Sequence, residues 1–232
     1  MRLSARLNTI AALVPVGARI ADIGTDHAYL PVYLVKQGVV SSALATDIAE
    51  GPCRAAALQV AGAGLSEKIA VRRGDGLAAI VSGEADTVII AGLGGASIIK
   101  ILDSQPVVLS SLDALILQPM SAARLLRNWL LANKWRLVRE ELAAEREKLY
   151  EIILAKPNKN KEQPSYTEFE LETGPLLLTG GHPLLANKVA LTAAKYRRLC
   201  HNMEKSPRPA NCNKYLTAKA ILNAAEEYLK CP

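Results

Sequence analysis

The sequence predicts an α/β fold, a seven-stranded and mostly parallel sheet followed by a small helical module. Short apolar runs rich in β-branched residues alternate with segments of helical periodicity over the first 157 residues. Such alternation is typical of a parallel sheet that helices cover on both faces. Glycines and carboxylates stand at the ends of the first strands, and heptad spacing appears only after a change in composition near residue 158. We therefore expect one domain over residues 1–157 and a second over 158–232.

The strands are expected at seven places, each a short run of mostly apolar residues. In chain order these are Arg19–Ile23, Ala43–Asp47, Lys68–Arg72, Thr87–Ala91, Ala114–Gln118, Trp135–Val138 and Tyr150–Ala155. Helical spacing lies between them at Leu30–Gln37, Pro52–Ala61, Ser97–Asp103 and Ala122–Asn133. The last two strands are close together, across Glu140–Lys148, so one of them is expected to run antiparallel to the rest.

The second domain is expected to be an antiparallel helical hairpin. A polar linker, Lys156–Lys161, precedes it, and a proline turn, Ser206–Pro209, divides it. Apolar residues recur at four-three spacing on both sides of that turn. They are Leu185, Val189, Thr192, Tyr196, Leu199 and Met203 before it, and Tyr215, Ala218, Leu222, Ala225 and Leu229 after it. Each helix has fewer than four heptads, which favours a small packing module over a dimerising coiled coil.

The formal net charge of the 232 residues is +6, and it is unevenly distributed. Up to Pro157 there are 17 Lys and Arg against 15 Asp and Glu, whereas the last 75 residues carry 11 against 7. A basic tail fits the binding of a polyanion, and it equally fits an ordinary basic surface that keeps the protein in solution. Charge alone does not separate these two interpretations.

The four cysteines and the opening residues exclude several classes of protein. Cys53, Cys200, Cys212 and Cys231 form no Cys-x-x-Cys pair, so we expect reduced thiols, no disulfide framework and no metal site. The first residues have neither a signal peptide's pattern nor a membrane span's length of apolar sequence. We expect a cytoplasmic protein with no membrane partner.

The segment Ile20–Tyr29 carries the strongest chemical signal. An apolar strand includes Asp22, turns at Gly24 and meets a second carboxylate, Asp26, before a helix. A dinucleotide site needs glycines there, because a pyrophosphate lies against the helix N-terminus. Asp26 would repel a diphosphate, whereas it would tolerate S-adenosylmethionine (SAM), which has a sulfonium cation, an amino group and no phosphate. We therefore expect a SAM site contacted by Asp22, Gly24, Thr25, Asp26 and His27.

Three neighbouring strand ends extend this site. Asp47 is placed to accept hydrogen bonds from a ribose diol, and Asp75 to hold the amine of adenine. Each of these aspartates has an alternative role as a helix N-cap. Three carboxylates at three successive strand ends jointly favour a nucleoside cofactor. Its further contacts are expected at Asp47, Ile48, Asp75, Gly76, Ala91 and Gly92.

Several motifs together resemble the bacterial SAM-dependent tRNA methyltransferases that modify N1 of the adenine at position 22. The motifs, which span the chain in order, are Leu3–Leu7, Ala21–Pro31, Gly74–Leu77, Ile90–Gly95, Ile116–Pro119 and Lys148–Glu151. The resemblance implies a Rossmann-like class I methyltransferase domain, a helical hairpin and a tRNA substrate. It also implies that Arg6 approaches the methionine carboxylate of SAM; the alternative is a solvated surface arginine. Leu93 and Met120 depart from the family pattern, in which Met and Asn are common.

The fourth strand end points to a ring nitrogen as the methyl acceptor. Enzymes that methylate an exocyclic amine usually carry an Asn/Asp/Ser-Pro-Pro-aromatic turn there, and Ala91–Gly95 has neither the side chain nor the prolines. His27 and Tyr29 are our catalytic candidates, to orient the base or share the loss of its proton. His27 has an alternative as a partner of Asp26, and Tyr29 as a core residue. Substrate contacts are expected at Gly94, Gly95, Gln118 and Pro119, with Gln118 reading a base edge or capping the next helix.

Phosphate contacts are expected from the basic hairpin, chiefly at Arg197 and Arg198. The alternative is the solvated face of an ordinary hairpin. Two other functions remain open from the sequence: a methyltransferase that acts on another RNA base or a small molecule, and a catalytically silent RNA-binding adaptor. An NAD-type oxidoreductase on the same sheet is opposed by Asp26. No obligate protein partner is inferred.

Overall fold

The structure, a computed structural model, describes residues 2–159, 162, 164–205 and 212–230. The chain divides into two compact units, Met1–Lys161 and Glu162–Pro232, and each is described by itself. The expected turn at Ser206–Pro209 and the cysteine Cys231 lie outside the described residues.

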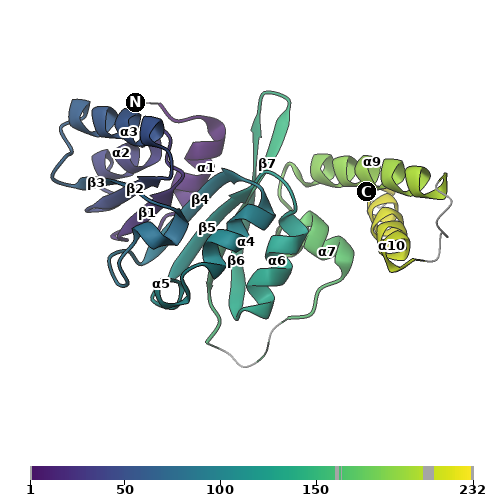
Figure 1. Cartoon of the computed structure of the whole chain (residues 1–232). Coiled ribbons are helices and arrows are strands. Elements are labelled where there is room, and N and C mark those ends of the chain that lie inside the picture. The colour runs from purple at the N-terminus through teal and green to yellow at the C-terminus, as the bar shows by residue number, and fades with distance from the viewer. Residues whose placement is uncertain (1, 160–161, 163, 206–211, 231–232) are drawn as a thin grey trace. The chain divides into compact units, whose positions relative to one another are not determined.

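The first unit contains a seven-stranded sheet with the order β3-β2-β1-β4-β5-β7-β6 (Figure 1). The strands are β1 (Ile20–Ile23), β2 (Ala43–Asp47), β3 (Ile69–Arg73), β4 (Thr87–Leu93), β5 (Ala114–Pro119), β6 (Trp135–Glu145) and β7 (Lys148–Pro157). The pairs among β1 to β5 are parallel, and β7 runs antiparallel to both its neighbours. The expected seven strands, with one antiparallel, are confirmed.

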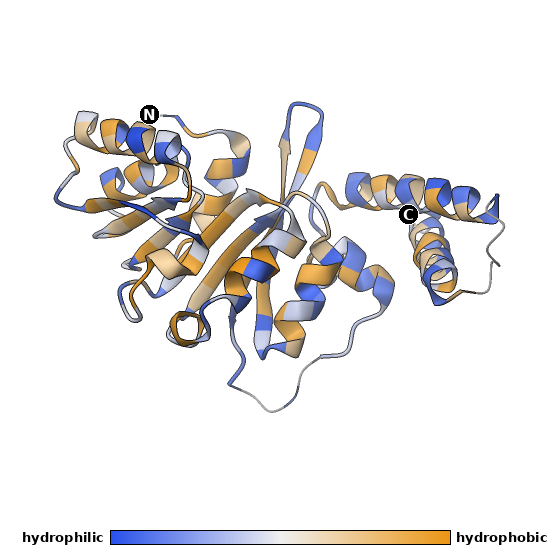
Figure 2. Cartoon of the chain, in the orientation of Figure 1, coloured by the Kyte–Doolittle hydropathy of each residue, from blue (hydrophilic) through white to orange (hydrophobic). Residues whose placement is uncertain are grey.

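The helices of the first unit cover the sheet because its central strands are apolar on both faces. They are α1 (Ala5–Leu13), α2 (Tyr29–Lys36), α3 (Glu50–Gly62), α4 (Gly95–Asp103), α5 (Pro106–Ser110) and α6 (Ala123–Ala132), with a 3₁₀ turn, η1 (Gly76–Ala79). Ile20, Ile89 and Ile116 join one buried cluster with residues of α1, α2 and α3. Ile90 and Leu117, the next residues along β4 and β5, point to the opposite face of the sheet and are also buried. Both faces of these strands are therefore covered. Figure 2 shows β4 and β5 as predominantly hydrophobic.

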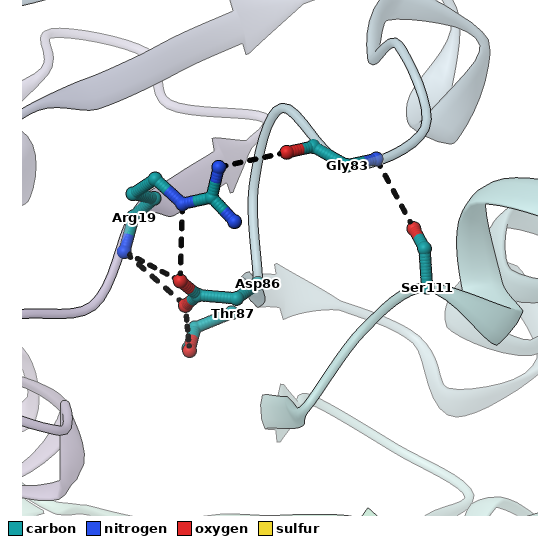
Figure 3. Close-up of polar contacts among 5 residues, drawn as sticks. All are labelled: Arg19, Gly83, Asp86, Thr87 and Ser111. Carbon is teal, nitrogen blue, oxygen red and sulfur yellow. Dashed lines mark hydrogen bonds and ion pairs between the residues drawn. The ribbon is translucent and has the colours of Figure 1, made fainter.

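Polar contacts fasten the amino-terminal edge of the sheet (Figure 3). The backbone amide of Arg19 donates to the carboxylate of Asp86 at 3.1 and 3.2 Å, and its guanidinium donates to the carbonyl of Gly83 at 2.9 Å. The amide of Gly83 donates to Ser111 Oγ at 3.4 Å. These bonds tie the starts of β1 and β4 to the segment before β5. Ligands of open parallel sheets bind at the opposite, carboxyl edge.

Strands β6 and β7 are longer than the sequence predicts. The segment Glu140–Lys148, expected to connect two short strands, is mostly strand, and the two strands turn at Arg146, whose φ is +55°. β7 pairs with β5 only at Ile153–Ala155. Residues 140–152, which we call the β6–β7 arm, therefore form a two-stranded ribbon that projects from the sheet (Figure 1). Its charged residues hide the strand pattern, because only part of a ribbon's surface is buried.

A buried ion cluster lies at the base of the arm. The guanidinium of Arg127, on α6, is fully buried and pairs with Glu140 at 2.6 Å and with Glu151 at 2.8 Å. Burial by itself would lower the pKa of Arg127, but the attraction of both carboxylates outweighs it and raises that pKa. The cluster fastens α6 to β6 and β7.

The second unit is helical, with α7 (Glu168–Thr173), α8 (Pro175–Gly180), α9 (Leu185–Glu204) and α10 (Asn213–Tyr228). Of the expected hairpin core, Leu185, Val189, Thr192, Tyr196, Ala218, Leu222 and Ala225 are buried. Leu229 is 44% exposed, so its predicted place in that core is wrong; it follows the last turn of α10. Tyr215 pairs with Glu204 and Arg197 with Glu226, so α9 and α10 run antiparallel. The six-residue helices α7 and α8 are too short to show a period in the sequence.

Candidate active site

A cavity of about 120 Å³ opens at the carboxyl ends of β1 and β4. It is lined by Arg6, Leu7, Asp22, Gly24, Thr25, Asp26, His27, Tyr29, Leu30 and Ala91. Eight of these ten residues are candidates from the sequence; Leu7 and Leu30 are additional. Ligand sites are typically about 300–1,000 Å³, so this cavity has room for only one end of a nucleoside-sized molecule.

The turn after β1 is held open by backbone hydrogen bonds to the neighbouring strand. The amides of Gly24 and Thr25 both donate to the carbonyl of Thr46, at 2.8 and 3.0 Å. Gly24 has φ +73°, a conformation that favours glycine, and a Cβ placed there would meet no atom within 4 Å. The space above this backbone is therefore free for a ligand to approach closely.

Asp22 is a buried carboxylate at the floor of this turn. Only 7% of the residue is exposed, and its Oδ2 accepts a hydrogen bond from the Thr25 hydroxyl at 2.6 Å. Burial raises the pKa of Asp22 to about 6, although Thr25 and the charge of Arg6 act to lower that pKa. The site thus holds a poorly solvated carboxylate that a cationic ligand would stabilise.

Asp26, His27 and Tyr29 form the rim of the cavity. Asp26 and Ala28 both have left-handed φ values, +54° and +52°, so α2 begins only at Tyr29. The imidazole of His27 lies 3.6 Å from the Asp26 carboxylate and stacks on the ring of Tyr29, with ring centroids 5.3 Å apart. Tyr29 is 43% exposed, so its alternative as a core residue is wrong. The stacked rings present a flat surface at the mouth of the cavity.

Arg6 is fixed from three sides rather than solvated. Its Nη1 donates to Gln118 Oε1 at 2.9 Å, and its guanidinium lies over the ring of Tyr150, 5.6 Å from the centroid. Its backbone amide donates to Glu145 at 3.2 Å. Hydrogen bonds from Ser4 and from that amide lower the pKa of Glu145. The β6–β7 arm, which carries Tyr150 and Glu145, therefore supports the arginine that lines the cavity.

The ends of β2 and β3 lie outside the cavity. Asp47 Oδ1 accepts a hydrogen bond from the amide of Ala49 at 2.9 Å, within the turn before α3. Asp47 is not the N-cap of that helix, because the N-cap is Ala49 and no side chain caps it. Asp75 is exposed and makes no capping bond to η1. Ile48 is 61% exposed. Gly76 has φ +53°, and a Cβ there would lie 2.9 Å from Ile101, so close packing demands a glycine.

The glycine loop after β4 is partly buried. Gly92 is exposed, but Gly95 is buried, and its amide donates to Ser121 O at 2.8 Å. A Cβ at Gly95 would lie 2.6 Å from the carbonyl oxygen of Ala122, and one at Gly94 would lie 3.2 Å from Ser121 Oγ. These glycines let two backbones pack together. The contact of Gly94 and Gly95 with a substrate base stays a prediction.

Gln118 and Pro119 lie at the carboxyl end of β5. Both are buried, and the Gln118 side chain has no exposed surface. It caps no helix, because its oxygen accepts hydrogen bonds from Arg6 and from the amide of Gly92, and no side chain caps α6. Its contact with a base edge stays a prediction. The sequence does not predict these two hydrogen bonds, because Arg6 and Gly92 lie 112 and 26 residues from Gln118 along the chain.

Arg197 and Arg198 lie on α9 in the second unit. Arg197 pairs with Glu226 at 2.7 Å, and Lys195 on the same helix pairs with Glu172 at 2.5 Å. Arg198 is exposed, and within the described residues no carboxylate lies within ion-pair distance of it. Arg208, another basic residue of this region, lies outside the described residues. Arg198 is therefore better placed than Arg197 to meet an outside anion.

Metal-ligand clusters, cysteine pairs and long apolar helices would each mark another kind of site. Among the residues with described positions, no three His, Cys, Asp or Glu side chains are grouped so as to hold a metal ion. Cys53, Cys200 and Cys212 are free thiols. No helix in the described ranges combines the length and apolar character that crossing a bilayer requires.

Residues 3–153 match a protein family described as a methyltransferase domain. A curated Bacillus subtilis relative, tRNA (adenine(22)-N(1))-methyltransferase, is 45% identical over 155 residues. That alignment covers 67% of this chain and 65% of the relative, so it spans just under two thirds of the relative's length.

Solved structures resemble the whole chain. The structure of the B. subtilis m1A22 tRNA methyltransferase is 33% identical with a TM-score of 0.80, covering 99% of this chain and 96% of that one. A Streptococcus pneumoniae protein in complex with S-adenosyl-L-methionine is 32% identical with a TM-score of 0.85, covering 98% and 100%. The similarity thus includes both units of the chain.

Proposed function

Since the chain belongs to the methyltransferase family that includes the bacterial tRNA (adenine(22)-N(1))-methyltransferases, we propose that it transfers a methyl group from SAM to N1 of adenine 22 in tRNA. The observation that carries the proposal is the cavity at the end of β1, where two carboxylates and one arginine surround an open glycine turn. We place the enzyme in the cytoplasm with its tRNA substrate, and infer no obligate protein partner.

The residues at this site fit SAM. Asp22 and Asp26 supply negative charge for a cation, and Arg6 keeps guanidinium donors for a carboxylate beside its bond to Gln118. The open space at Gly24 admits close backbone approach. Asp47 and Asp75, at the next strand ends, would hold the ribose diol and the adenine amine. A pyrophosphate would meet the carboxylates of Asp22 and Asp26 instead of amide donors, which disfavours a dinucleotide.

Catalysis by this chain rests on positioning. When bound, SAM supplies an electrophilic methyl group on a sulfonium. Adenine N1 carries an in-plane lone pair at neutral pH, so no strong base is needed near it. Fixing two reactants in line contributes up to roughly 7–11 kcal/mol in the best-oriented systems. The stacked rings of His27 and Tyr29 would hold the base. The imidazole of His27, beside Asp26, would help to accept the proton that the base loses after the methyl transfer.

The tRNA must open locally for N1 to be reached, which costs a few kcal/mol. Phosphate contacts offset such a cost, and they make binding depend on salt. The exposed cations of α9, with Arg198 foremost, are the proposed source of these contacts.

Mass spectrometry of tRNA nucleosides tests the function directly, because it identifies both the base and the modified atom. Purified enzyme and SAM should convert unmodified tRNA with A22 to a product with N1-methyladenosine. The same tRNA with G22 is the matched control and should stay unmodified. Methylation of the G22 control or of another atom would overturn the assignment, and no methylation at all would favour the RNA-binding adaptor. Calorimetry with SAM and with NAD separately tests the cofactor.

A further inference from the structure

The side chain of Gln118 joins three parts of the first unit. Its Oε1 accepts hydrogen bonds from Arg6 Nη1 at 2.9 Å and from the amide of Gly92 at 3.1 Å. Its Nε2 donates to the thioether sulfur of Met120 at 3.5 Å. A carboxamide has one accepting and one donating end, and both ends are occupied here. The orientation of this fully buried side chain is therefore fixed.

The bond to Gly92 replaces one that the sheet has lost. In the pairing of β4 with β5, Ala91 lies opposite Gln118 and Leu93 opposite Pro119, so Gly92 is an extra residue in the ladder. A bulged residue loses its ladder partner, and Gly92 also has φ +82°. The Gln118 oxygen takes its amide hydrogen instead. The shape of the glycine loop consequently depends on this side chain.

The bond to Arg6 orients the guanidinium. Arginine has several freely rotating side-chain bonds, and holding it costs conformational entropy. Gln118 accepts from one nitrogen while the Tyr150 ring supports the flat face. The remaining donors of the guanidinium are thus aimed by Gln118 and Tyr150, neither of which lines the cavity.

We propose that Gln118 is a positioning residue that sets Arg6 and the Gly92 loop in a fixed relation to each other. One side chain thereby prepares both the cofactor end and the base end of the site. The inference rests on the proposed function, in which Arg6 binds the SAM carboxylate, and on the predicted contact of the target base with Gly94 and Gly95, which follow Gly92 in the same loop.

The effect of Gln118 on cofactor binding is tested by a double-mutant cycle with Arg6. SAM affinity is measured by calorimetry for the full-length wild type, Gln118→Leu, Arg6→Ala and the double variant. Gln118→Leu should weaken SAM binding about tenfold or more. In the Arg6→Ala background, the same change should weaken SAM binding only about threefold or less, because the effect through Arg6 is gone and only that through Gly92 remains. An equal loss in both backgrounds would overturn the proposal, since a merely structural role predicts it.

The effect of Gln118 on the target base is tested by measuring turnover at saturating SAM. In the Arg6→Ala background, Gln118→Leu should still lower kcat on tRNA about tenfold, because the amide of Gly92 is released. Trp129→Phe, which removes a hydrogen bond to Asp103 of 3.0 Å in the same unit, is the matched control and should change neither SAM affinity nor kcat. An unchanged kcat for the Gln118 variant would overturn the proposed effect of Gln118 on the target base.

A second variant keeps the proposal testable if Gln118→Leu does not fold. Gln118→Glu has the same size and retains the acceptor for Arg6 and Gly92. Its carboxylate would compete with that of SAM for Arg6, so SAM affinity should fall about tenfold while kcat at saturating SAM stays within threefold of wild type. Wild-type affinity in this variant would overturn the proposal. Wild-type protein that bound no SAM would overturn the proposed function itself, whereas wild-type binding with unaffected Gln118 variants would remove only the positioning role.

Discussion

Asp22 is the residue in which folding and function oppose each other. Burial raises its pKa from 3.8 to about 6, so the charged form that suits a cationic ligand is disfavoured in the free protein. A folded pKa above the unfolded value means that this group's contribution to stability is present below about pH 4 and lost as pH rises through 6. The shift corresponds to a penalty on the order of 3 kcal/mol at neutral pH.

Asp22→Asn should therefore raise the free energy of unfolding at pH 7.5, by up to about 3 kcal/mol. The gain should shrink toward pH 4.5, where the unfolded aspartate is itself partly protonated. SAM affinity should fall about tenfold, because the buried anion is lost. Urea unfolding at both pH values, with calorimetry at pH 7.5, measures these effects. Asp113→Asn, at an exposed site, is the control; equal pH dependence in both variants would contradict the expectation.

His27 and Tyr29 are predicted to act on the base more than on the cofactor. His27→Ala and Tyr29→Leu should each lower kcat about 10- to 100-fold, since the base loses its stacking surface. SAM affinity should stay within about threefold. Steady-state kinetics with tRNA and calorimetry with SAM separate the two effects. Tyr33→Phe, on the same helix and packed against the core, should leave turnover unchanged. Unaltered kcat in both test variants would remove the pair from the mechanism.

At the scale of elements, the buried cluster at Arg127 determines how α6 is held against the β6–β7 arm. Arg127→Leu leaves Glu140 and Glu151 buried without their cation, and should lower the free energy of unfolding by about 3–5 kcal/mol. Urea denaturation measures the change. Arg139→Leu removes the partly exposed pair with Glu141 and should cost less than about 1 kcal/mol. Similar losses in the two variants would contradict a special role for the buried cluster.

The elements show which parts of the fold the sequence alone could predict. The predicted bounds of β1 to β5 agree with the structure within two residues. β1, β2, β4 and β5 are mostly buried and read as apolar runs, whereas β3 is a partly exposed edge strand. The sequence predicts strands that are too short at the β6–β7 arm, because charged residues such as Glu141 and Lys148 interrupt the apolar pattern. The same limit applies to the site. Asp22, Asp26 and Gly24 follow one strand and could be found, whereas the support of Arg6 by Gln118, Tyr150 and Glu145 depends on tertiary pairing across more than 100 residues.

At the scale of the whole molecule, the two units divide the proposed work between chemistry and tRNA binding. Arg198→Glu should weaken tRNA binding and reduce the slope of log affinity against log salt by about 1, because a phosphate contact is lost. Filter binding at several salt concentrations measures both. Lys68→Glu, an exposed lysine of the first unit, makes the same change in net charge and should have a smaller effect.

Arg197 is the second test of this division. Since it pairs with Glu226, Arg197→Glu should lower thermal stability, and the exchange Arg197→Glu with Glu226→Arg should restore stability. If charge reversal at Arg197 and at Arg198 left tRNA affinity and its salt slope unaltered, the helical hairpin would be a stabilising module only.

The support of Arg6 has a consequence for biosynthesis. Arg6 precedes the groups that hold it by 112 and 139 positions in the chain. A nascent chain on the ribosome can pair β1 with β2, and so assemble the turn at Gly24, whose amide bonds to Thr46, before Gln118 and Glu145 have been translated. We therefore expect α1 to dock late during synthesis, so that a chain arrested before residue 118 has the turn but lacks its oriented arginine.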